Sequence, residues 1–333
     1  MARRRSLIFL PLFSIMGCAF TRRRSKKTIS ASVVPALRHS YTLDEAFDYC
    51  ALVTRAHYEN FPVASLFLPG DKRPYIQVMY AFARAADDLA DEGVRPDGER
   101  LSGLDDWGRQ LEECFAGKAD HPVFIALRDT VERLRLPIEP FRDLLTAFRR
   151  DVTQHHYGSF EELLGYCRCS ANPVGRLVLL LFGHTDEHVT GLSDDLCTAL
   201  QLTNFWQDVG VDREKGRSYI PEEDMRTYGY TAEMWRQGVV DDSYRRLMQF
   251  QVDRTRELFY RAAELPSIVE KDLQIELRLV WFGGMKILRR LERSAYAHRP
   301  VLTFRDKAFI LLLGLFRNNL SRYGKKRKPW DLT

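Results

Sequence analysis

Several features that mark other classes of protein are missing from this sequence. Its 333 residues contain no apolar run of the ~20 residues that a membrane-spanning helix needs. No repeat of the kind that indicates a solenoid is visible. The six cysteines are scattered rather than spaced as a disulfide framework, which favours a reducing compartment. No Gly-x-Gly-x-x-Gly dinucleotide fingerprint occurs, so a dependence on NADPH is not expected.

A net positive charge is also missing from the middle of the chain. The net charge is +5, but residues 1–43 hold nine Lys and Arg without any Asp or Glu, and residues 305–333 hold eight basic and two acidic residues. Subtracting these ends leaves about −10 for residues 44–304. An acidic body repels phosphates unless a cation lies between them, so we expect no nucleic-acid partner. The charge distribution is still compatible with an anionic substrate that a metal ion bridges to the protein.

The chain divides into a leader, a large body and a tail. Residues 1–40 form a basic leader with a short apolar stretch, interpreted as disordered or superfluous, as a membrane-surface anchor or as an export signal. Arg22–Arg24 follow that stretch and oppose its translocation, so we favour the first interpretation. Residues 41–300 show no linker. Residues 301–333 contain an apolar helix followed by a basic tail. The helix is either part of the core or an interfacial helix attracted to anionic lipid.

The body should be all-α. Its apolar residues recur at three- and four-residue spacing, and the alternation typical of strands is scarce. Gly and Pro clusters predict breaks between helices at 68–70, 93–98, 117–122, 137–140, 183–191 and 210–221.

The first cluster of chemically informative residues lies within residues 80–92. A helix turns ~100° per residue, which places Tyr80, Arg84, Asp87 and Asp91 within one arc. The carboxylates of Asp87 and Asp91 repel one another unless a cation lies between them. Mg²⁺ takes a few carboxylates and keeps water and phosphate ligands. A solvated acidic face would give the same pattern.

A second polar stripe makes the metal interpretation more specific. Asn204, Asp208 and Asp212 lie at i, i+4 and i+8, with Gln201 one turn before them. Cationic and hydroxyl donors follow directly: Lys215, Arg217 and Tyr219. These groups suit a diphosphate whose oxygens are shared between Mg²⁺ and cationic side chains.

The two acidic segments resemble the paired Asp-rich motifs of the squalene/phytoene synthases, the head-to-head isoprenoid synthases. The matching segments are DDLAD (87–91), NFWQDVGVD (204–212) and GRSYIP (216–221). The resemblance runs from about Tyr41 to Pro300. It implies the isoprenoid (terpenoid) synthase fold, a single large helical domain around a central cavity, with the two Asp-rich helices facing one another at its mouth. It also implies a prenyl or triterpenoid diphosphate substrate.

The resemblance assigns roles to individual positions. It implies that Mg²⁺ and diphosphate are bound by Asp87, Asp91, Asn204, Asp208 and Asp212. It places Arg84, Arg217 and Tyr219 near the diphosphate, where the sequence adds Lys215, and it places Tyr80, Tyr166 and Gln201 in the cavity. The catalytic candidates are therefore Asp87, Asp91, Asp208, Asp212, Tyr80 and Tyr166.

Longer segments are similar to the hydroxysqualene synthase branch of bacterial hopanoid biosynthesis. They are HYENFPVASLFLP (57–69), YAFARAADDLADEG (80–93), YCRCSANPVGRL (166–177) and NFWQDVGVDREKGRSYIP (204–221). Three departures from the wider family stand out: Tyr58 and Asn60 replace a serine-rich segment, Asn172-Pro173 replaces part of an Ala-Gly pattern, and Gln207 replaces an arginine. The lost cation disfavours a condensation of two prenyl diphosphates. The new polar groups Asn60, Asn172 and Gln207 could hold a water.

These departures predict a Mg²⁺-dependent enzyme that ionises presqualene diphosphate and quenches the rearranged carbocation with water, giving hydroxysqualene. The alternatives are a presqualene diphosphate synthase or a squalene/phytoene synthase condensing two prenyl diphosphates. A non-catalytic helical assembly factor would be expected to have broken Asp motifs. A carbocation requires an apolar, aromatic cavity, with candidates Tyr80, Phe82, Tyr166, Phe205 and Trp206. Core packing is the ordinary expectation for Phe82, Phe205 and Trp206.

The proposed product, a C30 alcohol, indicates where in the cell the protein is expected to lie. Because such a product must leave into lipid, we expect a cytoplasmic protein in peripheral contact with the inner face of the membrane. Neighbouring enzymes of squalene synthesis are further candidate partners.

Overall fold

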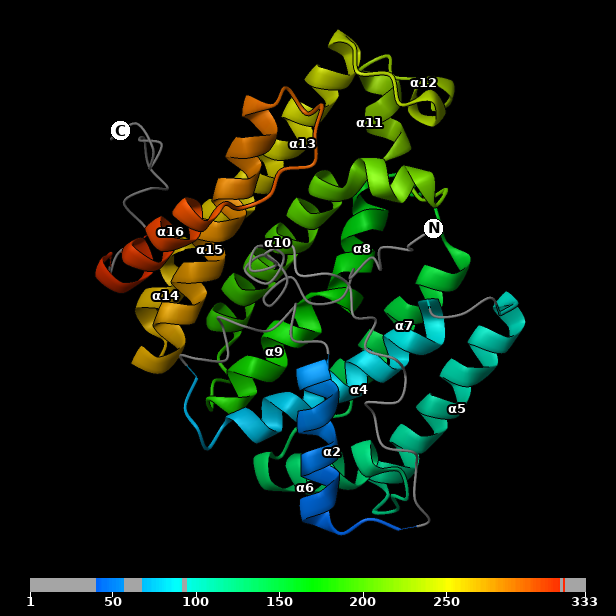
Figure 1. Ribbon diagram of the computed structural model, residues 1–333, viewed down its shortest axis with the longest axis vertical. Helices are drawn as coiled ribbons and strands as arrows, with labels where there is room; N and C mark the ends of the chain where they lie inside the picture. The colour runs from blue at the N-terminus through cyan, green and yellow to red at the C-terminus, as the bar shows by residue number, and fades with distance from the viewer. Residues whose placement is uncertain (1–39, 57–67, 92–94, 318–319, 321–333) are drawn as a thin grey trace.

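The computed structural model describes residues 40–56, 68–91, 95–317 and 320. These residues form helices joined by turns and short connections, and no strand occurs among them (Figure 1). The all-α expectation is confirmed. The helices are α2 (Leu43–Ala56), α4 (Arg73–Asp91), α5 (Asp97–Phe115), α6 (Pro122–Leu134), α7 (Glu139–Thr153), α8 (Phe160–Ser170), α9 (Asn172–Leu181), α10 (Glu187–Glu214), α11 (Glu222–Thr227), α12 (Ala232–Gln237), α13 (Asp242–Arg261), α14 (Leu265–Ile268), α15 (Lys271–Arg293) and α16 (Phe304–Phe316), with a 3₁₀ turn at Ala262–Glu264.

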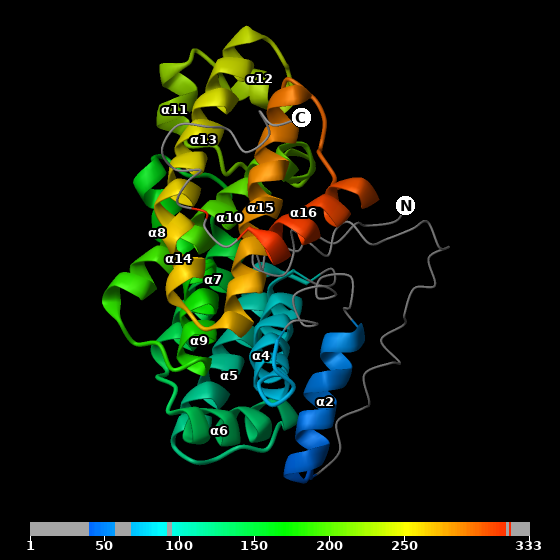
Figure 2. The ribbon, with the colours of Figure 1, turned by 90° about the vertical axis from the view of Figure 1, so that its left-hand side faces the viewer.

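Helix α10 is the central element of the arrangement. It packs against α8, α9, α13 and α15. Helices α2, α5 and α6 gather at one end of the long axis, and α11 and α12 lie at the other (Figures 1 and 2). Helix α4 packs against α2, α5, α6 and α7. The two helices that carry the acidic segments therefore belong to different parts of the bundle.

The predicted breaks mark helix ends in most cases, but α10 is longer than expected. It begins after Asp186, whose side chain accepts a hydrogen bond from the Val189 amide at 3.0 Å, and it runs through Gly191 and Gly210 to Glu214. A glycine inside a helix costs only about 1 kcal/mol, and burial of the apolar residues of α10 outweighs that cost. The helix ends before Gly216, whose φ of 73° requires the left-handed region.

Two of the candidate cavity aromatics, Phe82 and Trp206, are packed in the core. Phe82 packs against Trp107, Phe124 and Phe141. The Trp206 indole donates a hydrogen bond to the Thr255 hydroxyl at 2.8 Å, on α13. Both side chains have the core-packing role that is ordinary for aromatics at helical spacing.

The C-terminal helices pack closely at one glycine. A Cβ at Gly314 of α16 would lie 2.6 Å from Cδ2 of Leu279 on α15, so a larger residue there would require the Leu279 side chain to move. Between the two helices, Ala295 and Tyr296 both have positive φ, 47° and 61°, and the chain continues through residues 297–303 to α16. Among the described helices, none is long and apolar enough to cross a membrane.

Candidate active site

One ion pair joins the two acidic segments. The Arg217 guanidinium, which follows α10, lies 3.0 Å from Oδ1 of Asp91 at the end of α4. The same guanidinium donates to the Asp151 backbone carbonyl on α7 at 3.2 Å. Arg217 therefore links α4, α7 and the segment after α10. The predicted proximity of the two motifs is present in the structure.

The first segment holds its charges close together. Arg84 donates to Oδ2 of Asp87 at 2.8 Å and also bonds Asp88. Burial raises the pKa of Asp87 well above its usual range, and nearby Asp91 and Asp88 raise it further, while Arg84 opposes them. Tyr80 is buried two turns earlier on the same helix. A second positive charge near Asp87 would favour its ionised form.

The second segment receives an arginine from far along the chain. Arg299, which lies between α15 and α16, bonds both carboxylate oxygens of Asp208, one of them at 3.3 Å. Asp212 is buried, and burial together with the Asp208 charge raises its pKa to about 7. Asn204 is also buried on this face, and its amide nitrogen has no hydrogen-bond partner. Lys215 is exposed just beyond the helix end.

Tyr166 reaches the same region through an acidic residue that sequence reasoning missed. Its hydroxyl donates to Oδ1 of Asp151 at 2.8 Å. Burial raises the pKa of Asp151 to about 7, with the Tyr166 hydrogen bond and Arg217 opposing that rise. Both side chains are buried.

Aromatic rings surround Tyr219 beside these charges. Its ring stacks on Phe205 with centroids 3.8 Å apart and planes 6° from parallel. Tyr157 stacks on Tyr219, with ring centroids 5.7 Å apart, and meets the Tyr166 ring edge-on at 5.8 Å. Phe205 thus lies beside the candidate site, unlike Phe82. Ring faces of this kind favour positive charge.

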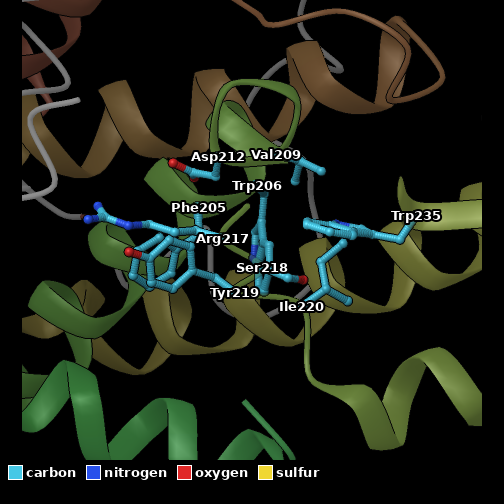
Figure 3. A pocket seen from close by; sticks show the side chains of 9 residues that line it. All are labelled: Phe205, Trp206, Val209, Asp212, Arg217, Ser218, Tyr219, Ile220 and Trp235. Atoms are coloured by element: carbon cyan, nitrogen blue, oxygen red, sulfur yellow. The ribbon is translucent and has the colours of Figure 1, made fainter. Parts of the chain in front are cut away.

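A pocket lies along one side of this cluster, between the end of α10 and residues 217–220 (Figure 3). It is lined by Phe205, Trp206, Val209, Asp212, Arg217, Ser218, Tyr219, Ile220 and Trp235, and its cavity volume is about 10 Å³. That is about the space that one water molecule needs. This pocket is therefore too small for a hydrocarbon chain, and the deep central cavity stays a prediction.

Farther down α10, a polar group is buried without a hydrogen-bond partner. Gln201 is fully buried, and neither its amide oxygen nor its amide nitrogen has a partner. One turn earlier, Thr198 donates to Oδ1 of Asn172 at 3.0 Å. Gln201 lies on the same face of α10 as Asp208, about 10 Å from it along the helix axis.

Gln207 has a partner that the sequence did not indicate. Its amide nitrogen donates to the Pro300 backbone carbonyl at 2.6 Å, and the side chain is buried. The structure therefore uses Gln207 to anchor the connection between α15 and α16. Asn60 lies outside the described residues.

The donor chemistry of the site fits Mg²⁺, although no preformed cage is present. Among the described residues, no group of three His, Cys, Asp or Glu side chains converges on one point. Asp87, Asp91 and Asp208 are each held by an arginine, and Oδ1 of the buried Asp212 has no hydrogen-bond partner. Mg²⁺ commonly takes one or two carboxylates and completes its shell with water and substrate phosphate, so separate acidic residues are sufficient.

Asp151 and Arg299 could not have been found from local sequence signals. Asp151 follows two arginines on an ordinary amphipathic helix, and Arg299 is separated from Asp208 by 91 positions. Neither forms part of a spaced motif, so only the packing of α7 and of the α15–α16 connection brings them to the site.

Comparisons with known proteins agree with this geometry. Residues 54–306 match the family model described as squalene/phytoene synthase. The chain is 32% identical to the phytoene synthase of Arthrospira platensis over 80% of this chain and 91% of the relative. It is 35% identical to the 15-cis-phytoene synthase of Synechococcus elongatus over 81% of this chain and 89% of the relative.

Solved structures give the same picture. The squalene synthase HpnC from Alicyclobacillus acidocaldarius superposes with a TM-score of 0.74 at 42% identity, covering 77% of this chain and 96% of that chain. A dehydrosqualene synthase in complex with a ligand gives a TM-score of 0.74 at 26% identity, covering 82% and 96% of the two chains.

Proposed function

Since the chain belongs to the squalene/phytoene synthase family, we propose that it is a Mg²⁺-dependent hydroxysqualene synthase. The family consists of isoprenoid biosynthetic enzymes that act on prenyl diphosphates and are generally metal-dependent. The predicted family, fold and enzyme class are therefore confirmed, and membership of this family speaks against a non-catalytic assembly factor.

The proposed reaction takes presqualene diphosphate and water to hydroxysqualene and diphosphate. The carbon–oxygen bond to diphosphate breaks, and its electron pair leaves with the diphosphate. The oxygen of water then bonds the rearranged carbocation, and the proton that it loses passes to diphosphate or solvent. Mg²⁺ bound by the acidic residues would neutralise the leaving group.

The chain's own residues have separate parts in this proposal. Asp87, Asp91, Asn204, Asp208 and Asp212 would hold Mg²⁺ and through it the diphosphate, and Arg84, Lys215, Arg217 and Tyr219 would contact the remaining diphosphate oxygens. The rings of Tyr80 and Tyr166 face the carbocation and exclude bulk water. Arg217 also fixes the distance between the two acidic helices through its ion pair with Asp91.

The choice of hydroxysqualene as the product rests on one observation, the buried side-chain amide of Gln201 that has no hydrogen-bond partner. A buried polar group without a partner costs about 1–3 kcal/mol, and a water is the smallest occupant that can bond both amide atoms. Thr198 and Asn172 add polar atoms one turn away. These groups support a bound water on the hydrocarbon side of the aspartates, where a carbocation would meet it.

Arg299 supports a second candidate function. The absence of an arginine at position 207 argued against the condensation of two prenyl diphosphates, but Arg299 supplies a guanidinium to Asp208 from another segment. A cation beside the second motif is therefore present, and this feature no longer distinguishes quenching by water from the condensation of two prenyl diphosphates. A presqualene diphosphate synthase, or a squalene/phytoene synthase, is the alternative.

One assay separates these functions. Purified protein with Mg²⁺ is given farnesyl diphosphate or presqualene diphosphate, in water enriched in oxygen-18, and the lipid product is identified. We expect labelled hydroxysqualene from presqualene diphosphate alone. A C30 product from farnesyl diphosphate by itself would refute the proposal in favour of the condensing enzymes, and no product from either substrate would refute the hydroxysqualene synthase.

A substitution at Gln201 tests the water site. Gln201→Leu keeps the side-chain volume but removes both amide atoms, so we expect less hydroxysqualene relative to hydrocarbon products of the same substrate. Thr203→Val is the matched control, because Thr203 is buried on another face of α10 and bonds the Ala199 carbonyl. An unchanged product ratio in Gln201→Leu would remove Gln201 from the proposal.

The proposal also includes the surroundings of the enzyme. A C30 alcohol has little solubility in water, so we place the protein in the cytoplasm, in peripheral contact with the inner face of the membrane. Neighbouring enzymes of squalene synthesis would supply presqualene diphosphate and consume hydroxysqualene.

A further inference from the structure

Exposed apolar side chains are concentrated in one short part of the chain. Nine large hydrophobic residues are exposed among the described residues, and six of them lie within residues 301–316. Two phenylalanines of α16 stand out, because Phe304 and Phe316 are 77% and 76% exposed. Single exposed apolar residues are normal on protein surfaces, but contiguous groups mark interaction sites.

These residues form one face of α16. A turn of ~100° per residue places the exposed side chains within an arc of roughly 140°. They are Phe304, Ala308, Phe309, Leu312, Leu315 and Phe316. The opposite face is buried and carries Asp306, Lys307, Ile310 and Gly314, of which Gly314 contacts α15. Helix α16 therefore packs on the protein with one side and presents an apolar face with the other.

The charge on and around this face is positive. Arg305 is the charged residue within the exposed arc, and Arg317 follows the last turn. The acidic residue of the helix, Asp306, is buried and paired with Arg290 and Lys286. Beyond Arg317 the sequence continues to the basic run 325–328. An apolar helix face with flanking cations suits the interface of an anionic bilayer.

From this face and these charges, we infer that α16 is the site at which the protein docks on an anionic membrane surface. The thirteen-residue helix lies in the interface instead of crossing it. Docking here has a consequence for the site. Phe304 is five residues from Arg299, whose side chain bonds Asp208, so at most about 18 Å of chain separates Phe304 from the residue that contacts the second acidic segment. A lipid product would have a short path to the bilayer.

The choice of lipid as the occupant rests in part on the proposed function, but the test does not. Binding is measured by flotation without substrate or Mg²⁺, on vesicles of phosphatidylcholine alone and on vesicles with equal parts of phosphatidylglycerol. We expect binding to the anionic vesicles, weakened by salt, and little binding to the neutral ones. Failure of the hydroxysqualene assay would leave this result unaffected.

Two variants, each with more than one substitution, show whether α16 is responsible for vesicle binding. The variant Phe304→Ser/Leu312→Ser/Phe316→Ser should lower vesicle affinity at least tenfold while its circular dichroism and its turnover in detergent stay at wild-type values. The control Leu43→Ser/Phe250→Ser changes two exposed apolar residues on α2 and α13 and should bind like the wild type.

Four results would overturn the inference. Three concern flotation: wild-type protein that does not float with anionic vesicles, a triple variant that floats as well as wild type, and a control variant that loses as much affinity as the triple variant. A fourth is a wild-type dimer in solution that the triple variant converts to a monomer, because the face would then bind a second copy of the chain.

Discussion

Glu276 should make the stability of this protein fall as the pH rises, and glutamine at this position should remove that dependence. The residue lies on α15 and is 3% exposed, and neither carboxylate oxygen has a hydrogen-bond partner. Burial alone raises the pKa of Glu276 from 4.5 to about 8. Glu276→Gln keeps the shape of the side chain and removes the titrating group.

The expected magnitude follows from the two pKa values. Below pH 4.5 the carboxyl is protonated in both states and contributes no pH dependence. Between 4.5 and about 8 the folded state holds a proton that the unfolded state has released, so the free energy of unfolding falls by about 1.4 kcal/mol per pH unit. The loss approaches about 5 kcal/mol once the pH exceeds the folded pKa. The glutamine variant should not show it.

The assay is urea unfolding followed by circular dichroism, with wild type and variant measured side by side. From about pH 5.5 to about pH 7.5, the free energy of unfolding of Glu276→Gln should rise relative to wild type by about 2.7 kcal/mol. Other buried acids, such as Asp151, titrate in both proteins and cancel in the difference. Glu257→Gln, at an exposed position on α13, is the control and should follow the wild-type curve.

Parallel pH curves for wild type and Glu276→Gln would refute the reasoning. They would mean that the carboxyl has a polar partner or bound water in solution and is not isolated by the packing of α15. A difference that grows toward low pH would contradict the sign of the linkage.

Three further predictions concern the site and the packing around it. Asp208→Asn should abolish turnover while the helical circular-dichroism spectrum is unchanged, and retained activity would remove Asp208 from the metal assignment. Arg217→Met should lower kcat more than tenfold, because it breaks the ion pair between the motifs, whereas Arg226→Met, at an exposed position of α11, should not. Gly175→Ala should destabilise the protein by about 1–3 kcal/mol, since its Cβ would lie 2.5 Å from the Cys197 sulfur and the Ser193 hydroxyl. Gly191→Ala, where the same atom meets open space, should be neutral or stabilising in the same unfolding measurement.

The periodicity of the sequence predicted the all-α architecture because burial of one helix face leaves a regular apolar pattern in the chain. It overestimated the effect of glycine at 191 and 210, since α10 continues through both positions. A break signal from a residue type is weak when the neighbouring side chains are buried, because packing free energy exceeds the roughly 1 kcal/mol cost of a helical glycine.

The acidic motifs were visible for a similar reason. Residues four positions apart on a helix share a face, so a set of carboxylates needed at one place leaves a regular spacing in the sequence. Residues that reach the site from other helices leave no such spacing. Asp151 and Arg299 belong to this second group, and so does the contact between Gln207 and Pro300.

The sequence by itself determined the family, the helical fold and the two acidic faces on α4 and α10, because these depend on side-chain identity and local spacing. Only the tertiary structure decided which cations hold the aspartates, that Gln207 anchors a distant connection, that Gln201 is buried without a partner and that one face of α16 is exposed. These features depend on how separate helices pack against one another. Contacts across such interfaces join residues that are far apart in the chain, and no local pattern of residues records them.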